Sequence, residues 1–198
     1  MDKRKVEFYW DVGSTNTYFA YKLIKPIVQR TNAKLVLHPF NLGYVFRSRD
    51  YILMEEPEIK LANRKRDLQR WADKYNLPFK FPDQFPIKTS RALRGAIAMR
   101  RWDLEDAYTE AILDAYWERQ DASIANYSGL RPIVHALGVN PDEFESASES
   151  EAVRQELIDS TNQGLARGVF GVPSLFVGDE MFWGKDRMEF VEDELRRH

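Results

Sequence analysis

The fold is decided by the stretch Val6-Glu-Phe-Tyr-Trp-Asp-Val-Gly-Ser14. Its apolar and aromatic run predicts a short buried strand that ends in a glycine turn. Apolar residues at helical spacing from Tyr18 to Val28 predict a helix directly afterwards, which Thr15 or Asn16 would cap. A second β-branched run follows at residues 33–40. A strand, a helix and a strand with short connections form a βαβ unit, so we expect two parallel strands.

The middle of the chain is helical in character. Apolar spacing predicts helices over residues 59–75, 90–102, 104–119, 124–137, 141–147 and 149–167. Ser148-x-x-Glu151 predicts a capping box at the start of the last of these. Two strands are then predicted, Pro173 to Val177 and Glu180 to Trp183, joined by a two-residue turn and followed by a final helix.

The predicted order is therefore β-α-β, a block of helices, and β-β-α. This order is typical of an α/β protein with a thioredoxin-like core and a large all-helical insertion. The length of 198 residues suits this arrangement. We expect a discontinuous thioredoxin-like domain of residues 1–56 and 168–198, and a helical insertion domain of residues 57–167.

Composition excludes several classes of function. The chain has no cysteine, which removes disulfides, thiolate metal sites and a redox thiol, and its three histidines argue against a histidine-rich metal site. Its 29 Lys and Arg against 31 Asp and Glu provide no overall attraction to nucleic acid or to a membrane surface. The N-terminus has no leader-like pattern, and no apolar run reaches membrane-spanning length. We expect a cytoplasmic protein with neither a metal nor a nucleic-acid partner.

Thioredoxin-like proteins carry their reactive group between the first strand and the first helix. Here Ser14 and Thr17 stand where a redox-active member has two cysteines, so the chain itself cannot exchange disulfides. A hydroxyl beside free backbone N–H groups, at the positive end of a helix dipole, suits an anion. The alternative is that Ser14 only caps the helix.

Two further segments belong near this position in such a fold. Val172-Pro173 precedes the third strand, where thioredoxin-like proteins keep a cis-proline, although an ordinary trans-proline at a strand start is the alternative. Trp183-Gly184-Lys185-Asp186 leads into the last helix and offers a helix N-terminus, a cation and a carboxylate. Simple capping is the alternative for this segment.

Five spaced motifs carry a resemblance to a known family. They are Phe8-x-x-Asp11-x-x-Ser14, Asp67-Leu-Gln-Arg-Trp-Ala72, Pro78-x-x-Phe-Pro82, Val169-Phe-Gly-Val-Pro173 and Phe182-Trp-Gly-Lys-Asp-Arg-Met188. Together they resemble the 2-hydroxychromene-2-carboxylate isomerase family, which is related to kappa-class glutathione transferases and to the DsbA-like superfamily. The resemblance covers essentially the whole chain, although Thr15 departs from the proline that members commonly carry.

The resemblance implies glutathione as the cofactor and a homodimer. It places the glutathione thiol at Ser14, the cysteinyl backbone on Val172 beside Pro173, and the γ-glutamyl end at Trp183, Gly184, Lys185 and Asp186. The expected function is glutathione-dependent cis–trans isomerisation of an unsaturated aromatic carboxylate, by reversible addition of the thiolate. In this reaction Ser14 donates a hydrogen bond to the charged sulfur and forms no covalent bond.

The substrate carboxylate would need a cation. Arg47, Lys88 and Arg91 are expected to overhang the helix that begins near Ser14, and we expect at least one of them to pair with the carboxylate. Two alternative functions stay open. One is a kappa-like transferase that conjugates or reduces electrophiles with glutathione, and the other is a redox-inactive thioredoxin-like module that binds an extended peptide along Val172-Pro173.

Overall fold

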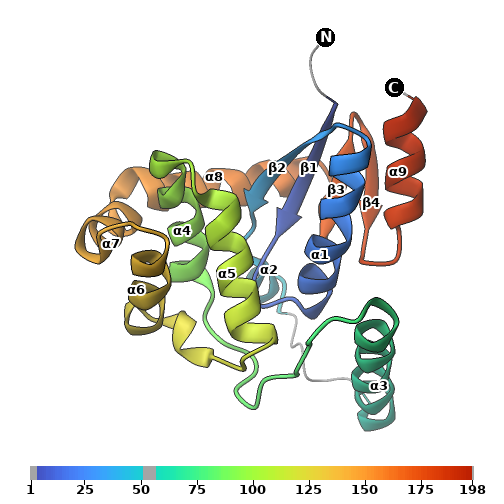
Figure 1. Cartoon of the computed structure of the whole chain (residues 1–198), viewed down its shortest axis with the longest axis horizontal. Helices are drawn as coiled ribbons and strands as arrows, with labels where there is room; N and C mark the ends of the chain where they lie inside the picture. The colour runs from blue at the N-terminus through green and yellow to red at the C-terminus, as the bar shows by residue number, and fades with distance from the viewer. Residues whose placement is uncertain (1–3, 51–56, 198) are drawn as a thin grey trace.

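A computed structural model of the protein describes residues 4–50 and 57–197 (Figure 1). Four strands form one sheet in the order β2-β1-β3-β4. They are β1 (Lys5–Trp10), β2 (Lys34–Pro39), β3 (Ser174–Val177) and β4 (Glu180–Trp183). β1 pairs in parallel with β2 and antiparallel with β3, and β3 pairs antiparallel with β4. The parallel pair is joined through α1 (Thr15–Arg30), which confirms the predicted βαβ unit.

The other helices follow the predicted order closely. They are α2 (Leu42–Ser48), α3 (Glu58–Tyr75), α4 (Ser90–Met99), α5 (Glu105–Trp117), α6 (Tyr127–Ala136), α7 (Pro141–Glu149), α8 (Glu151–Ala166) and α9 (Met188–Arg197), with short 3-10 helices η1 (Arg100–Trp102) and η2 (Ala122–Ala125). This arrangement confirms the α/β, thioredoxin-like fold with a helical insertion. α2 was not predicted from the sequence.

The predicted capping box of α8 is wrong. Ser148 is buried within α7, where its hydroxyl donates to the Phe144 carbonyl at 2.8 Å. The N-cap of α8 is Ser150, two residues later, and its hydroxyl accepts the hydrogen bond from the Val153 amide. Ser148 satisfies the capping-box pattern through Glu151, but it is used inside α7, and Ser150 caps α8 without a Glu or Gln three residues later.

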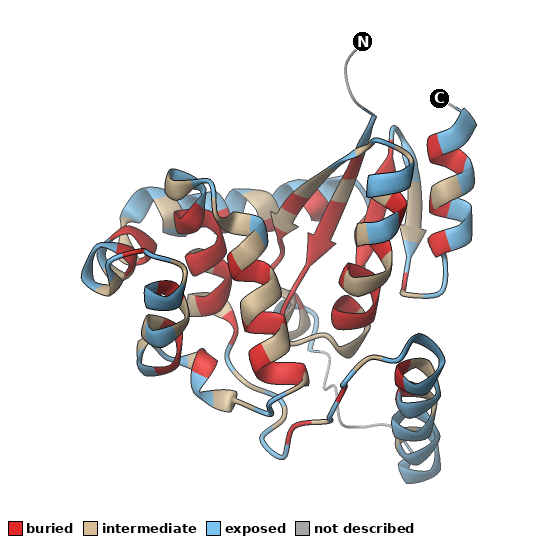
Figure 2. Ribbon diagram, in the orientation of Figure 1, coloured by how far each residue is buried: buried red, intermediate tan, exposed pale blue. Residues whose placement is uncertain are grey.

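Helices cover both faces of the sheet. α1 and α9 lie on one face and α8 lies on the other (Figure 1). Phe8 and Trp10 of β1 face the α1 side, whereas Tyr9 faces the α8 side and packs against Gly164. β1 and β3 are accordingly the buried strands of Figure 2. The start of α1 lies at the end of the buried strand β1.

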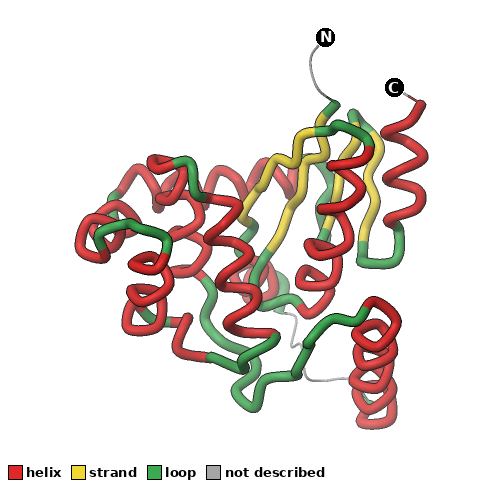
Figure 3. Tube along the Cα trace, viewed as in Figure 1, coloured by secondary structure: helices red, strands yellow, loops and turns green. Residues whose placement is uncertain are grey.

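α3 stands apart from the other helices. Of its residues, all of which are described, Leu68 and Ala72 alone are buried, and Figure 2 shows most of its surface exposed. A long loop of residues 76–89 leads from α3 across to α4 (Figure 3). Phe79 anchors this loop, because its ring packs 4.9 Å from the Phe19 ring and 6.0 Å from the Trp117 ring.

The division into two domains stays a prediction. The predicted boundary at residue 56 lies outside the described residues. Within the predicted insertion, α8 packs directly on the sheet: the Ser160 hydroxyl donates to the Pro39 carbonyl at 2.8 Å. No helix within residues 4–50 and 57–197 combines the length and the apolar character needed to cross a bilayer.

Candidate functional site

Ser14 lies at the junction of β1 and α1. It occupies the N-cap position of α1, yet its side chain makes no capping hydrogen bond among the described residues. Its hydroxyl instead donates to the Val172 carbonyl at 3.0 Å. A serine kept only for helix capping would accept a hydrogen bond from an amide of the first helical turn. The expected cap residues, Thr15 and Asn16, are already inside the helix.

The Val172-Pro173 peptide bond is cis and lies against the Ser14 hydroxyl. The structure thus brings together two segments that are 158 residues apart in the sequence. No acidic residue occupies the first turn of α1, so the positive end of its dipole is not neutralised within that turn. An anion placed at Ser14 would be stabilised by both the hydroxyl and the helix end.

A buried carboxylate, that of Asp11, organises the turn before Ser14. Its Oδ1 accepts from the Gly13 amide at 2.9 Å, and its Oδ2 accepts from the Leu42 amide at 3.0 Å and the Thr89 hydroxyl at 3.1 Å. Burial raises the pKa of Asp11 to about 6, although these three hydrogen bonds act to lower it. One side chain therefore ties the Ser14 turn to α2 and to the residue that precedes α4.

Asp11 and Thr89 were not assigned a role from the sequence. A carboxylate at the end of an apolar strand was the signal that could have found Asp11. Thr89 gives no comparable signal, because its partner lies 78 residues away. The contact between Asp11 and Thr89 also limits the space around Gly13. A Cβ added to Gly13 would lie 3.0 Å from the Thr89 methyl carbon.

The turn between β4 and α9 lies beside the Val172-Pro173 segment and the start of β3. The Gly184 amide donates to the Pro173 carbonyl at 3.0 Å, and Trp183 is the strand partner of Ser174. The half-exposed Trp183 ring lies 5.1 Å from the ring of Phe170. Hydrogen bonds therefore hold Ser14, the Val172-Pro173 segment and this turn next to one another.

Lys185 connects that turn to α3. Its Nζ lies 3.9 Å from the Asp67 carboxylate and 4.8 Å from the centre of the Trp71 ring. Burial lowers the pKa of Lys185, while attraction to Asp67 and Asp186 opposes the shift. The Asp186 carboxylate accepts from Arg187 at 2.6 Å, two residues before α9 begins.

The three cations expected at the substrate carboxylate lie in different surroundings. Lys88 is exposed and adjoins Thr89. Arg47 is exposed on α2, with its Nη1 close to Gly43 of the same helix. Arg91 donates to the Asn126 side chain at 3.1 Å and lies over the Tyr127 ring, so it faces α6. Their role in substrate binding stays a prediction.

The family model of the DSBA-like thioredoxin domain matches residues 5–196. A 2-hydroxychromene-2-carboxylate isomerase of Pseudomonas sp. (strain C18) is 30% identical over 200 residues, covering 95% of this chain and 88% of the relative. Glutathione S-transferase kappa 2 of Caenorhabditis elegans is 24% identical over 208 residues, covering 98% and 92%. A solved 2-hydroxychromene-2-carboxylate isomerase structure matches with a TM-score of 0.86 at 28% identity, covering 98% and 95%.

Fold and site define a DSBA-like thioredoxin domain in which a serine stands at the start of the first helix. The chain belongs to this domain family and, within it, to the 2-hydroxychromene-2-carboxylate isomerase family. The family resemblance carried by the five sequence motifs is thereby confirmed.

Proposed function

We propose that this protein is a glutathione-dependent cis–trans isomerase of an unsaturated aromatic carboxylate of the 2-hydroxychromene-2-carboxylate type. Relatives named as isomerases support the reaction class. The observation that carries the proposal is the Ser14 hydroxyl, which lies at the N-terminus of α1 and is not used for capping among the described residues.

The residues around Ser14 fit a thiol-bearing tripeptide. Ser14 would contact the thiol, and the Val172 backbone beside Pro173 would hold the peptide part. The turn of Trp183, Gly184, Lys185 and Asp186 would hold the γ-glutamyl end, where Lys185 and Asp186 supply a cation and an anion for a group that carries both charges. The hydrogen bonds from Ser14 to Val172 and from Gly184 to Pro173 support this assignment, because they keep the three segments adjacent.

When bound, glutathione would supply the thiol that the chain lacks, and reversible addition of that thiol to the conjugated double bond permits rotation. Ser14 would donate its hydroxyl hydrogen to the thiolate sulfur. A free thiol has a pKa near ~8.5, and lowering it by about two units requires roughly 2.7 kcal/mol. A hydrogen bond to a charged group contributes about 1.5–3 kcal/mol and a helix terminus about 0.3–1 kcal/mol. These two contributions suffice.

Turnover of 2-hydroxychromene-2-carboxylate tests the proposal. The reaction should require glutathione, whose concentration should stay unchanged while substrate is converted. Ser14→Ala should lower kcat/KM by roughly 10–100-fold, because the thiolate loses its donor. Ser128→Ala is the matched control, since this exposed serine of α6 belongs neither to the Ser14 turn nor to the junction of α7 and α8, and its loss should leave kcat/KM unchanged. Turnover at full rate without glutathione would refute the cofactor.

A kappa-like glutathione transferase is the second candidate, and the kappa-class relative favours it. A transferase joins glutathione to an electrophile and releases the adduct, so each turnover consumes one thiol. Measuring free thiol during the reaction separates the two functions. Stoichiometric loss of thiol would replace the isomerase proposal with the transferase.

A further inference from the structure

A cavity of about 270 Å³ lies between α2, α4 and α8. Its wall combines the guanidinium groups of Arg94 and Arg154 with apolar surface from Leu157, Ile158 and the half-exposed ring of Tyr44. The volume is close to the lower end of the range for small-molecule sites, about 300 Å³. A cavity of this size and lining suits one ring with an anionic substituent.

The cavity adjoins the Ser14 turn through Asp11. Two of the residues that line it, Asn41 and Ser90, are chain neighbours of Leu42 and Thr89. Leu42 and Thr89 are the residues of α2 and of the loop before α4 that donate to the Asp11 carboxylate. The same side chain therefore positions both the turn that carries Ser14 and one wall of the cavity.

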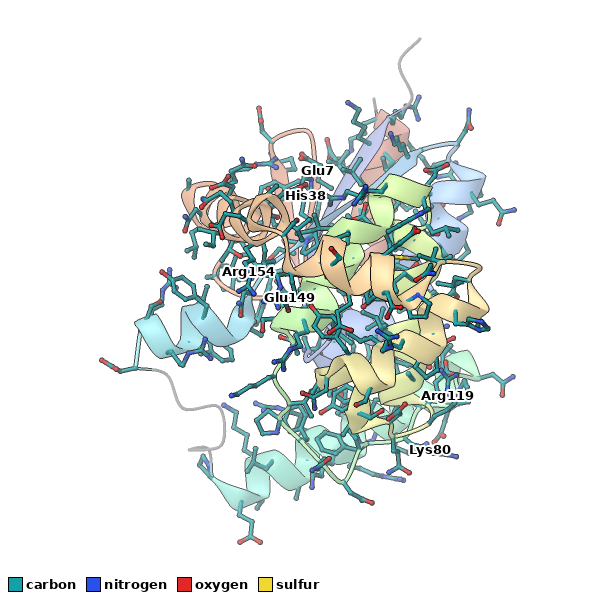
Figure 4. All side chains as sticks on the ribbon, turned by 90° about the vertical axis from the view of Figure 1, so that its left-hand side faces the viewer. Glu7, His38, Lys80, Arg119, Glu149 and Arg154 are labelled. Atoms are coloured by element: carbon teal, nitrogen blue, oxygen red, sulfur yellow. The ribbon has the colours of Figure 1, made fainter. Side chains whose placement is uncertain are left out.

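Glu149 orients both guanidinium groups. Arg94 donates from Nη2 to the Glu149 carboxylate and from Nε to the Ser148 carbonyl, while Arg154 donates from Nη2 to the same carboxylate and from Nε to the Glu149 carbonyl. Figure 4 shows Arg154 and Glu149 side by side near α2. Nη1 of Arg154 has no hydrogen-bond partner within the described part of the chain, whereas the Arg94 guanidinium also interacts with the Tyr127 hydroxyl. Two cations share one carboxylate, which leaves an excess positive charge at the cavity.

This excess persists at neutral pH. Burial raises the pKa of Glu149, but hydrogen bonds from Tyr127 and Arg94 outweigh it and hold the pKa below its ordinary value. The carboxylate is therefore fully charged near neutrality, and arginine stays charged at any working pH. The side chain of Arg94 is only 12% exposed and lines the cavity.

We propose that this cavity binds the carboxylate-bearing end of the substrate, with Arg94 and Arg154 as the residues that recognise the carboxylate. The identity of the substrate rests on the proposed function, whereas the existence of the site rests on the cavity. Two guanidinium groups match the charge and the two oxygens of a carboxylate. Tyr44, Leu157 and Ile158 supply the apolar surface for the ring. Lys88 is the competing cation, because it also adjoins Thr89.

Calorimetric titration with trans-cinnamate, without glutathione, tests this site directly. Cinnamyl alcohol has the same ring and side chain but no charge, and it should bind much more weakly. Arg154→Gln and Arg94→Gln should each weaken cinnamate binding by about tenfold or more, the effect of losing one charge-assisted hydrogen bond. Arg131→Gln is the matched control, because Arg131 pairs with Asp142 and Glu145 on α7 and does not line the cavity.

The outcomes separate this inference from the proposed function. Unchanged cinnamate binding in both Arg94→Gln and Arg154→Gln, equal binding of the alcohol, or no binding to the native protein would overturn the site. Loss of binding in Lys88→Gln, with Arg154→Gln unaffected, would move carboxylate recognition to Lys88. If cinnamate binding depended on Arg154 while turnover needed no glutathione, the cavity would stand and the isomerase mechanism would fail.

Discussion

At the scale of single residues, Ser14 and Asp11 have different roles at the start of α1. Ser14 presents a hydroxyl whose partner is the Val172 carbonyl, and a thiolate brought to this position can replace that carbonyl as acceptor. Asp11 holds the turn through three hydrogen bonds while it is almost fully buried, with 2% of its surface exposed. The position of the Ser14 hydroxyl therefore depends on the buried carboxylate of Asp11.

Burial of Asp11 predicts a pH-dependent stability. Its pKa is raised from 3.8 unfolded to about 6 in the folded protein, so the folded state binds more protons in this interval. The free energy of unfolding should therefore fall as pH rises from about 4 to 6, by on the order of 3 kcal/mol for this group. Asp11→Asn abolishes this titration but places an amide against backbone donors.

Urea unfolding of the native protein and of Asp11→Asn at pH 4.5 and pH 7.5 measures this effect. The native protein should exceed the variant in stability by more at the lower pH, because there its own carboxyl is neutral. An equal difference at both pH values would show that the Asp11 carboxyl does not titrate between them.

Lys185 provides a second test at this scale. Lys185→Met keeps the length of the side chain and its apolar stem beside Trp71, but removes the cation next to Asp67. Glutathione affinity, measured by calorimetry, should fall by roughly tenfold or more through the lost charge-assisted contact. Affinity equal to that of the native protein would remove Lys185 from the γ-glutamyl site.

At the scale of elements, the sequence pattern predicted the strands and most helices, because local periodicity encodes them. β1, α1 and β2 follow directly from the apolar runs of the first forty residues. α2 was missed, since it has only seven residues and its one buried side chain is that of Val45. The cap of α8 was misplaced because the local pattern points to Ser148, which the structure buries inside α7.

The candidate site, too, could be predicted only in part from the sequence. Ser14 and the residue pair Val172-Pro173 could be located because the order of the strands brings them together. Thr89 and the arginines Arg94 and Arg154 could not, because their relevance depends on contacts between elements that are far apart in the sequence.

Close packing between α4 and its neighbours gives an element-scale prediction. A Cβ added to Gly95 would lie 2.2 Å from the Tyr108 hydroxyl oxygen and 2.8 Å from the Phe144 ring, and both side chains are fully buried. Gly95→Ala should lower the free energy of unfolding by about 1–3 kcal/mol, despite the higher helix propensity of alanine. Urea unfolding measures the change.

Gly43→Ala is the control for this substitution. The new methyl group would meet only the end of the Arg47 side chain, at 3.4 Å, and the Asn41 side chain at 3.8 Å. Because Gly43 lies within α2, alanine should leave the free energy of unfolding unchanged or raise it by up to about 1 kcal/mol. Equal stability of the two variants would show that the contact of Gly95 with Tyr108 and Phe144 does not restrict α4.

At the scale of the whole molecule, the candidate glutathione site links parts of the chain that are distant in sequence. The β1–α1 turn, the segment before β3 and the β4–α9 turn all contribute to it, and Lys185 connects them to the loosely held α3. A ligand that spans these segments stabilises the folded state only. Glutathione at about 100 times its Kd should add roughly 2.7 kcal/mol and raise Tm by roughly 5–10 °C. A Tm unchanged at millimolar glutathione would contradict binding at this site.

Ultraviolet titration of the thiolate in the protein–glutathione complex measures directly whether Ser14 stabilises the glutathione thiolate. Since the chain has no cysteine, the thiolate absorbance reports glutathione alone. We predict that binding to the native protein lowers the pKa of the glutathione thiol by about two units, and that Ser14→Ala returns most of this shift while Ser128→Ala retains it. A thiol pKa that is the same in the bound and free states, or that is lowered equally in Ser14→Ala, would contradict the assignment of Ser14 as the donor to the thiolate.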